Sequence, residues 1–188
     1  IGAWVEEGQS LGYLRGTAAV KKSDGSYEYV ANSNLGKSFA PKFGSFSINY
    51  SWNNFNLFTS GDYQLDGKIV ELSFLLRHIR GHDSTGIPTE IDGKTSPFNY
   101  TNFFAFESDF LKIRTIGLSY DFGPKLNFLT NIRIGFTATN PFNWTKGDFD
   151  PETTGSGIGN QNGFGSGSFV YGTESAPRTY ITSLKLEF

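Results

Sequence analysis

Residues 43–64 read FGSFSINYSWNNFNLFTSGDYQ, and their spacing decides the fold class. From Phe46 to Trp52 every second residue is large and apolar, and the residues between them are small and polar. Period-2 alternation of this kind indicates a β-strand with one apolar and one polar face. Asn53 and Asn54 follow, and asparagine tolerates the positive φ angles of a tight hairpin turn. The stretch therefore predicts two antiparallel strands, at about 43–52 and 55–64, joined by a short turn.

The same alternation recurs along the chain. It predicts further strands at about 10–20, 110–122, 131–140 and 178–188, and none of the six contains a proline. In the strand at 110–122, Lys112 and Arg114 fall on the otherwise apolar face, so that end is expected to rise above the apolar zone. The stretch at 68–79 has apolar residues near helical spacing, which predicts a short helix there. These residues are Ile69, Leu72, Leu76 and Ile79.

The connections between these strands alternate in length. Those at 53–54 and 123–130 are short, and those at 21–42, 65–109 and 141–177 are long. Strands of about ten residues with short turns on one side and long loops on the other are typical of a transmembrane β-barrel. In hydrocarbon every backbone polar group must be paired, which a closed sheet achieves. A soluble β-sandwich also alternates, but loops longer than about 15 residues are uncommon in compact domains.

Aromatic residues gather at the short-turn ends of the predicted strands. Amphipathic rings favour the interface between the hydrocarbon and the headgroups, so these residues predict a periplasmic aromatic girdle. Its members are Tyr50, Trp52, Tyr120 and Phe122.

Composition excludes several other classes. The chain has no cysteine, so it offers no disulfide framework or thiolate metal site. Its formal net charge of −2 gives no electrostatic reason to expect nucleic-acid binding. No run of 18 apolar residues is present, which excludes a transmembrane helix. No Ser-His-Asp, Cys-His or paired-carboxylate arrangement stands on elements that would fix its geometry, so no catalytic site and no enzyme activity are predicted.

Three segments resemble the C-terminal part of SusC/RagA-type TonB-dependent outer-membrane transporters of Bacteroidetes. They are ESDFLKIRTIGLSYDFGPK (107–125), RIGFTATNPFNWTKGDFDPE (133–152) and SAPRTYITSLKLEF (175–188). EGQSLGYLRG (7–16) and GKSFAPKFGSFSINYSWNNFNL (36–57) resemble the family's pattern further upstream. The resemblance covers nearly the whole chain.

The resemblance implies a function for the complete protein. Family members are plugged barrels of about 22 strands. Together with a SusD-like surface lipoprotein, which lies over the extracellular mouth, they import oligosaccharides or peptides, and TonB acts on the plug. Six strands are fewer than the roughly eight that a barrel needs, so 1–188 is expected to be a C-terminal barrel segment without the plug. Long loops would then be extracellular and the C-terminus periplasmic. A barrel that acts as a scaffold or assembly site without transporting is the alternative.

Two clusters contain residue types that bind metal ions. His78 and His82 are spaced i, i+4 with Asp83 next to them, but no HExxH pattern is complete and Gly81 disfavours a helix, so a solvated loop is predicted. The stretch DFDPE places carboxylates at Asp148, Asp150 and Glu152, and a calcium ion in a loop could bind to their oxygens. Pro151 favours instead a shaped turn in which a carboxylate accepts backbone N–H groups. No metal or other cofactor is therefore assigned.

The remaining candidate residues lie in loops and at the C-terminus. Aromatic residues in the long connections could stack on a substrate or pack against a lid partner: Trp144, Phe149, Phe164, Phe169 and Tyr171. The glycine-rich run at 153–172 is predicted to be irregular loop. A terminal aromatic preceded by alternating apolar residues resembles the signal read by the outer-membrane assembly machinery. Its residues are Tyr180, Leu184, Leu186 and Phe188.

Overall fold

The computed structural model describes residues 1–124, 129–152, 169–170 and 175–188. Over these residues the chain is mostly antiparallel β-strand with one α-helix, and the sheets do not close into a barrel. The predicted fold class, an all-β barrel segment, is confirmed. None of the described helices is both long and apolar enough to cross a membrane. The chain forms two compact units, the first made of Ile1–Lys42, Gln64–Asp109 and Thr145–Ser175, and the second of Phe43–Tyr63, Phe110–Trp144 and Ala176–Phe188.

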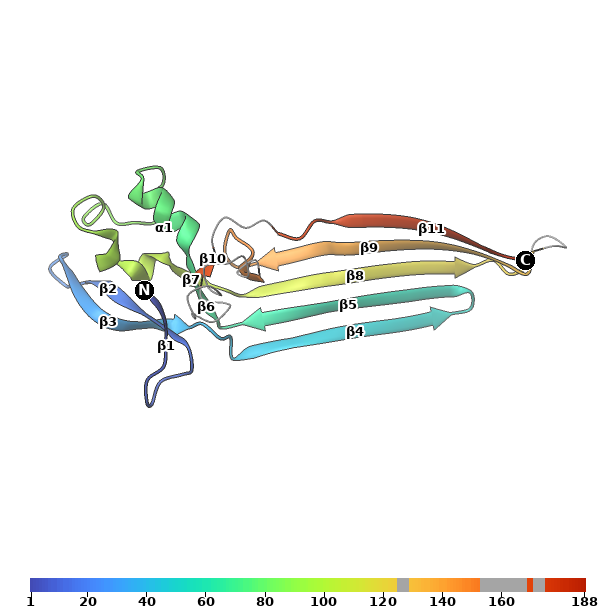
Figure 1. Ribbon diagram of the computed structural model, residues 1–188, viewed down its shortest axis with the longest axis horizontal. Helices are drawn as coiled ribbons and strands as arrows, with labels where there is room; N and C mark the ends of the chain where they lie inside the picture. The colour runs from blue at the N-terminus through green and yellow to red at the C-terminus, as the bar shows by residue number, and fades with distance from the viewer. Residues whose placement is uncertain (125–128, 153–168, 171–174) are drawn as a thin grey trace. The chain divides into compact units, whose positions relative to one another are not determined.

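The second unit is a five-stranded sheet with the strand order β11-β9-β8-β5-β4 (Figure 1). Its strands are β4 (Lys42–Trp52), β5 (Phe55–Leu65), β8 (Phe110–Asp121), β9 (Asn131–Thr145) and β11 (Thr179–Glu187). They correspond to five of the segments in which alternation predicted strands. Each has 9 to 15 residues, enough to span a bilayer at the usual tilt.

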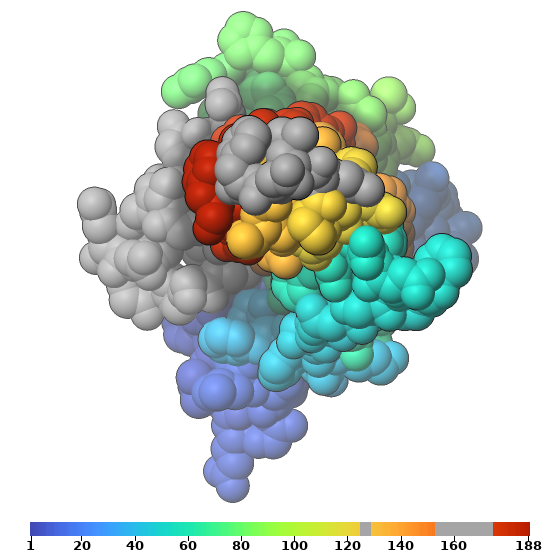
Figure 2. Space-filling view, turned by 90° about the vertical axis from the view of Figure 1, so that its right-hand side faces the viewer, coloured from blue at the N-terminus to red at the C-terminus, as the bar shows by residue number. Residues whose placement is uncertain are grey.

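The short β4–β5 turn forms at Asn53–Asn54, where Asn53 has a φ of 51°, as the sequence predicted. This turn, the last residues of β8, the first residues of β9 and the C-terminus lie at one end of the sheet (Figure 1). Viewed from that end, the colours follow the strand order of the sheet, from red β11 through orange β9 and yellow β8 to cyan β5 and β4 (Figure 2).

The register between β9 and β11 separates two faces. Leu184 pairs with Ile134 and Leu186 with Ile132, whereas Lys185 pairs with Arg133. Paired residues in an antiparallel sheet point to the same side, so aliphatic and aromatic side chains share one face and polar ones share the other. Tyr180 adds to the apolar face, where its ring stacks on that of Phe136 at 6.2 Å.

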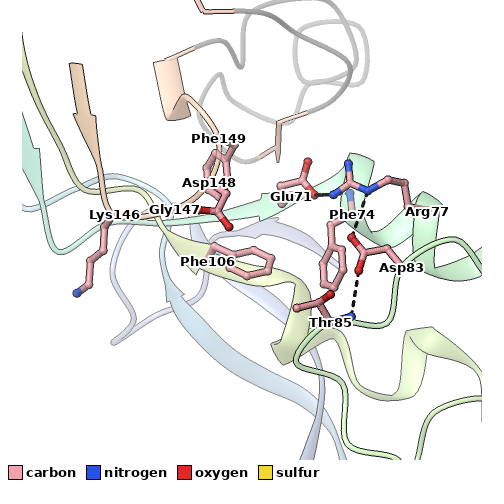
Figure 3. Close-up of a pocket in the computed structure, with 10 residues that line it drawn as sticks. All are labelled: Glu71, Phe74, Arg77, Asp83, Thr85, Phe106, Lys146, Gly147, Asp148 and Phe149. Atoms are coloured by element: carbon pink, nitrogen blue, oxygen red, sulfur yellow. Dashed lines mark hydrogen bonds and ion pairs between the residues drawn. The ribbon is translucent and has the colours of Figure 1, made fainter. Parts of the chain in front are cut away.

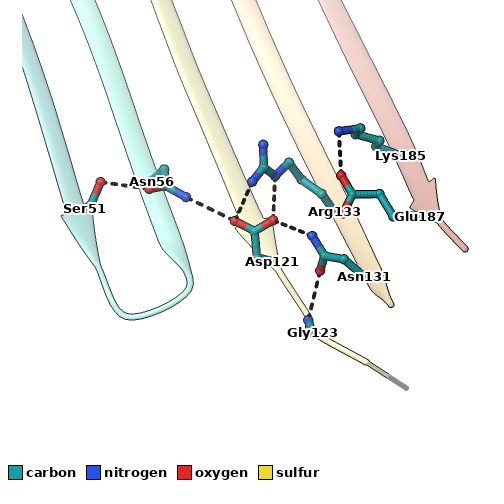
Figure 4. Close-up of polar contacts among 8 residues, drawn as sticks. All are labelled: Ser51, Asn56, Asp121, Gly123, Asn131, Arg133, Lys185 and Glu187. Carbon is teal, nitrogen blue, oxygen red and sulfur yellow. Dashed lines mark hydrogen bonds and ion pairs between the residues drawn. The ribbon is translucent and has the colours of Figure 1, made fainter. Parts of the chain in front are cut away.

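A hydrogen-bonded chain runs across the polar face near the short-turn end (Figure 4). The Asp121 carboxylate accepts Nε of Arg133 at 2.5 Å, Nδ2 of Asn131 at 3.3 Å and Nδ2 of Asn56 at 3.4 Å. The Ser51 hydroxyl donates to Oδ1 of Asn56 at 2.8 Å. These contacts place polar residues of four neighbouring strands on one side of the sheet, which agrees with the alternation.

The alternation of β8 does not extend to Arg114. Its guanidinium makes two bonds to the Asp62 carboxylate, at 2.5 and 2.7 Å, and Asp62 belongs to the polar set of β5. Lys112 is buried, with Nζ 5.2 Å from the ring centre of Phe110. The two basic residues that the sequence assigned to an apolar face are thus accommodated by an ion pair and by an aromatic ring.

The first unit contains two small sheets and the helix. One sheet has the order β1-β2-β3 and the other β10-β6-β7. The strands are β1 (Gly2–Trp4), β2 (Tyr13–Lys21), β3 (Tyr27–Lys37), β6 (Lys68–Glu71), β7 (Ala105–Glu107) and β10 (Phe169–Val170). The strand predicted at 10–20 therefore forms as β2, but it pairs with β1 and β3 and lies outside the five-stranded sheet. Strand β3 occupies part of the segment predicted as a long connection.

Helix α1 (Leu72–Ile79) follows β6 directly, and two short 3-10 helices, η1 (Pro97–Asn99) and η2 (Thr101–Phe104), precede β7. The Glu71 side chain caps α1 by accepting the backbone N–H of Phe74. The short helix predicted within 68–79 is confirmed, with Phe74, Leu75 and His78 buried and Ile79 exposed. Of the four residues at helical spacing, Ile69 belongs to β6, and Leu72 is partly buried and packs against the core. The buried face of α1 packs into the main hydrophobic core, which includes Tyr100 and Phe104.

Candidate functional site

The described part of the first unit contains a hollow of about 460 Å³. It is formed by the end of β6, helix α1 and the loop after it, strand β7, and the segment that follows β9 (Figure 3). Its lining residues are Glu71, Phe74, Arg77, Asp83, Thr85, Phe106, Lys146, Gly147, Asp148 and Phe149. Hollows of this size accommodate small-molecule ligands or individual side chains of larger ones.

Three phenylalanine rings form the apolar part of the wall. Phe106 packs edge-on against Phe74, with ring centres 5.8 Å apart, and against Phe149 at 6.0 Å. Edge-to-face packing is the favoured geometry for such pairs, and it holds rings from α1, β7 and the post-β9 segment together.

Arg77 links two carboxylates on the α1 side of the hollow. Its Nη2 lies 3.8 Å from Oε2 of Glu71 and its Nε lies 3.5 Å from Oδ2 of Asp83. The other carboxylate oxygen of Asp83 accepts the backbone N–H of Thr85 at 3.0 Å. The guanidinium also lies over the Phe74 ring, 5.8 Å from its centre. The positive charge of Arg77 is therefore partly balanced by Glu71 and Asp83, which both line the hollow.

The two carboxyl groups have different proton affinities. Burial raises the pKa of Glu71 above its ordinary value, and the opposing bond from the Phe74 N–H is the smaller effect. The backbone N–H of Thr85 lowers the pKa of Asp83, followed by the contact with the Thr85 side chain. Asp83 is therefore the more firmly ionised of the two at neutral pH.

Lys146 and Asp148 stand on the opposite side. The Lys146 amine is turned away from the hollow in Figure 3 and lies 3.9 Å from carboxylate oxygens of both Glu107 and Asp109. Asp148 is exposed, and its carboxylate points toward the hollow beside Phe106 (Figure 3). Within the described residues it has neither an ion pair nor a hydrogen bond from its side chain.

Two of the aromatic residues predicted as contact candidates have described side chains. Phe149 lines the hollow, whereas Trp144 is an exposed residue of β9 in the second unit. Phe169 begins β10, where it pairs with Val70, but its side chain is outside the described part. Phe164 and Tyr171 lie outside the described residues. No local pattern groups the other nine lining residues, because they come from segments far apart in the chain.

The prediction that both histidines lie in a solvated loop was wrong for His78. His78 is buried in α1, because it follows Phe74 by one helical turn and so shares its face. Its Nε2 lies 2.8 Å from the Tyr100 hydroxyl and its Nδ1 lies 3.1 Å from the carbonyl oxygen of Asp83. His82 is exposed, as expected for a loop.

The turn predicted at DFDPE is confirmed. Asp150 is buried and its Oδ1 accepts the backbone N–H of Glu152 at 3.1 Å. Across the described ranges no three His, Cys, Asp or Glu side chains are grouped as metal ligands would be.

The proposed girdle and C-terminal residues are exposed on the five-stranded sheet. The girdle residues Tyr50, Trp52, Tyr120 and Phe122 occupy the short-turn ends of β4 and β8, with Phe122 directly after β8. The rings of Tyr120 and Phe122 pack edge to face at 4.7 Å. Tyr180, Leu184 and Leu186 follow every second position of β11, and Phe188 comes just after it.

No protein-family model matches the sequence, and no curated protein matches it either. Solved structures do match. The chain is similar to a chain of the RagAB peptide transporter with a TM-score of 0.64 and 17% identity, over 100% of this chain and 24% of that chain. It is similar to the RagAB peptide importer in the "open-open" state (TM-score 0.60, 14% identity) and in the "closed-closed" state (TM-score 0.60, 15% identity), again over its whole length.

The chain spans about a quarter of the length of those RagAB chains, 24% in one case and 25% in another. Both units take part in the similarity, because it covers all residues of this chain. The RagA-type resemblance seen in the sequence is thus confirmed in the structure, and the chain has the fold of about one quarter of a RagAB transporter chain.

Proposed function

We propose that this chain forms part of the wall and extracellular loops of a SusC/RagA-type, TonB-dependent importer in the outer membrane. The observation that carries the proposal is the similarity to RagAB chains over the whole length, at TM-scores of 0.60 to 0.64. The complete importer would take up oligosaccharides or peptides. This chain would contribute no chemistry of its own, and its similar structures are described as importers and transporters.

The second unit supports a membrane location. Nearly all side chains of β11 are exposed, on both faces of the strand, so no described element of its own unit covers either face. A single layer with an aliphatic and aromatic face suits lipid on that side and a polar lumen on the other. Within the described residues β4 and β11 are the outer strands of this sheet, and closure of a complete barrel would pair them with further strands.

The same arrangement supports an orientation. The end of the sheet with the short turns and the C-terminus would face the periplasm, with Tyr50, Trp52, Tyr120 and Phe122 at its lipid interface. The first unit, built from the long connections, would be extracellular. A SusD-like lipoprotein would cover it, and TonB would act on a plug contributed by another part of the complete protein.

Uptake by cells tests this proposal. Deleting the gene for the complete protein should abolish import of one class of labelled substrate, either oligosaccharides or peptides, and complementation should restore it. A SusD-like lipoprotein should co-purify with the complemented protein. If import of both classes persists while surface proteins are lost from the deletion strain, the barrel acts as a scaffold and the transport proposal is wrong.

We also propose that Tyr180, Leu184, Leu186 and Phe188 form the C-terminal assembly signal. Replacing Phe188 with aspartate should reduce the amount of folded barrel in the outer membrane several-fold, because the assembly machinery would lose its terminal aromatic contact. Uptake per assembled barrel should stay unchanged. Quantitative blots of heat-modifiable barrel alongside uptake measure both values, and wild-type assembly of the Phe188→Asp variant would contradict the assignment.

A further inference from the structure

The hollow in the first unit has an excess of negative charge on its inward side. Glu71, Asp83 and Asp148 contribute carboxylates, and Arg77 alone contributes a cation, since the Lys146 amine is turned away toward Glu107 and Asp109 (Figure 3). Even with Glu71 protonated, the remaining two carboxylates outnumber the one guanidinium. A bound cation would therefore improve the charge balance of the hollow, and a bound anion would worsen it.

Asp148 is the carboxylate that remains available. Arg77 already neutralises part of the charge of Glu71 and Asp83, at 3.8 and 3.5 Å. Asp148 has no such partner among the described residues, and it stands across the hollow from that group (Figure 3). An ammonium or guanidinium group that enters the hollow could pair with it.

The phenylalanine rings suit the same ligand. The face of an aromatic ring carries negative partial charge and attracts cations, as the Arg77 guanidinium over Phe74 illustrates at 5.8 Å. Phe106 and Phe149 extend this apolar wall toward Asp148. A ligand with an apolar stem and a cationic end group would place the stem along these rings and the cation beside the Asp148 carboxylate.

We infer that this hollow is a subsite for the basic side chain, lysine or arginine, of a peptide that the transporter captures. The inference rests on the proposed import function and makes it more specific. Neutral oligosaccharides lack the cation that the charge pattern selects, and acidic peptides would place a second anion beside Asp148. A long basic side chain combines the apolar stem and the charged head that the two parts of the wall accept.

Calorimetric titration of the purified complete transporter tests this subsite. The ligands are three pentapeptides, capped at both ends, that differ only at the central residue among glycines: lysine, norleucine or glutamate. The lysine peptide should bind roughly fivefold more tightly than the norleucine peptide, as expected for one partly exposed ion pair. The glutamate peptide should bind most weakly, and added salt should reduce the preference for lysine.

Two variants assign the preference to the hollow. Asp148→Asn should remove most of the preference for lysine over norleucine, and Phe149→Leu should reduce it while leaving norleucine binding nearly unchanged. Glu7→Gln is the matched control, because Glu7 is an exposed acid of the same unit that does not line the hollow. It should bind all three peptides as the wild type does.

The failures are distinguishable. Equal binding of the three peptides, binding of none of them, or an Asp148→Asn variant that keeps the full preference would each overturn the subsite while cellular import continued to support the transporter. Loss of the import role itself would appear only in the uptake experiment with the deletion strain.

Discussion

Replacing Leu184 with arginine is expected to prevent nearly all assembly of the barrel. Leu184 is 64% exposed and pairs with Ile134 on the apolar face of β11 and β9. In a bilayer, arginine at a lipid-facing position near the midplane costs about 2–4 kcal/mol. Heat-modifiable mobility on gels and protection from external protease measure the folded fraction in the outer membrane.

Ile181 provides the matched control for this substitution. It lies in the same strand, is 54% exposed and pairs with Thr137 on the opposite, polar face. Ile181→Arg changes the same kind of residue to the same charge, but its side chain would enter the aqueous lumen, so assembly should stay close to wild type. Equal assembly of the two variants would mean that the two faces do not have the lipid and water environments assigned to them.

The second large effect is expected in the first unit. Phe104 has no exposed surface, and its ring lies 5.5 Å from Phe74, 5.5 Å from His78 and 5.9 Å from Tyr100. Phe104→Ala removes the central ring of this cluster, and truncations of this kind typically cost about 3–5 kcal/mol. The free energy of unfolding of the first unit should fall by that order, and limited proteolysis should cleave its loops much faster.

Phe98 is the corresponding control. It belongs to η1, only a few residues away, and is 55% exposed. Phe98→Ala should leave the rate of proteolysis within about twofold of wild type, because exposed apolar side chains contribute little to stability. Similar proteolysis rates for Phe104→Ala and Phe98→Ala would contradict the core placed around Tyr100 and Phe104.

The strands of the second unit could be predicted because their environment repeats. Each side chain of β11 lies on either the apolar or the polar face of the sheet. The change from Leu184 to Lys185 therefore shows in the sequence that neighbouring residues lie on opposite faces. The register follows from that pattern, since a slip by one residue would exchange the two faces. Arg114 departs from the pattern because its long side chain reaches Asp62, a contact that depends on the neighbouring strand.

The first unit was harder to predict because its strands are irregular. The pairing of β2 with β3 shifts register twice, near Leu14 and again after Gly16, and Asn32 has a φ of 57° within β3. Bulges of this kind break period-2 alternation, so β3 gave no signal. The burial of His78 was predictable from its spacing, because it follows Phe74 by one helical turn and Phe74 is buried. The polar residues that follow the helix, Arg80 to Asp83, favoured the loop interpretation instead.

The hollow could be predicted only in part. Both Phe149 and Asp148 line the hollow. The sequence marked Phe149 as a possible contact for substrate or lid, and Asp148 as one of three carboxylates that calcium could bind. Their proximity to Arg77 and Asp83 depends on the packing of β7 between distant segments, which no local pattern in the sequence specifies.

Site-directed spin labelling of β11 tests the central claim most directly, namely that one face of this sheet meets lipid and the other meets water. Residues 1–188 contain no cysteine. After replacement of any cysteine elsewhere in the complete protein, single cysteines are introduced at positions 180 to 186, and the labelled protein is reconstituted in bilayers. We predict that labels at 180, 182, 184 and 186 collide preferentially with oxygen, which concentrates in lipid, and that labels at 181, 183 and 185 collide with a water-soluble nickel chelate. Uniform accessibility to the nickel chelate at all seven positions would contradict a membrane-spanning sheet.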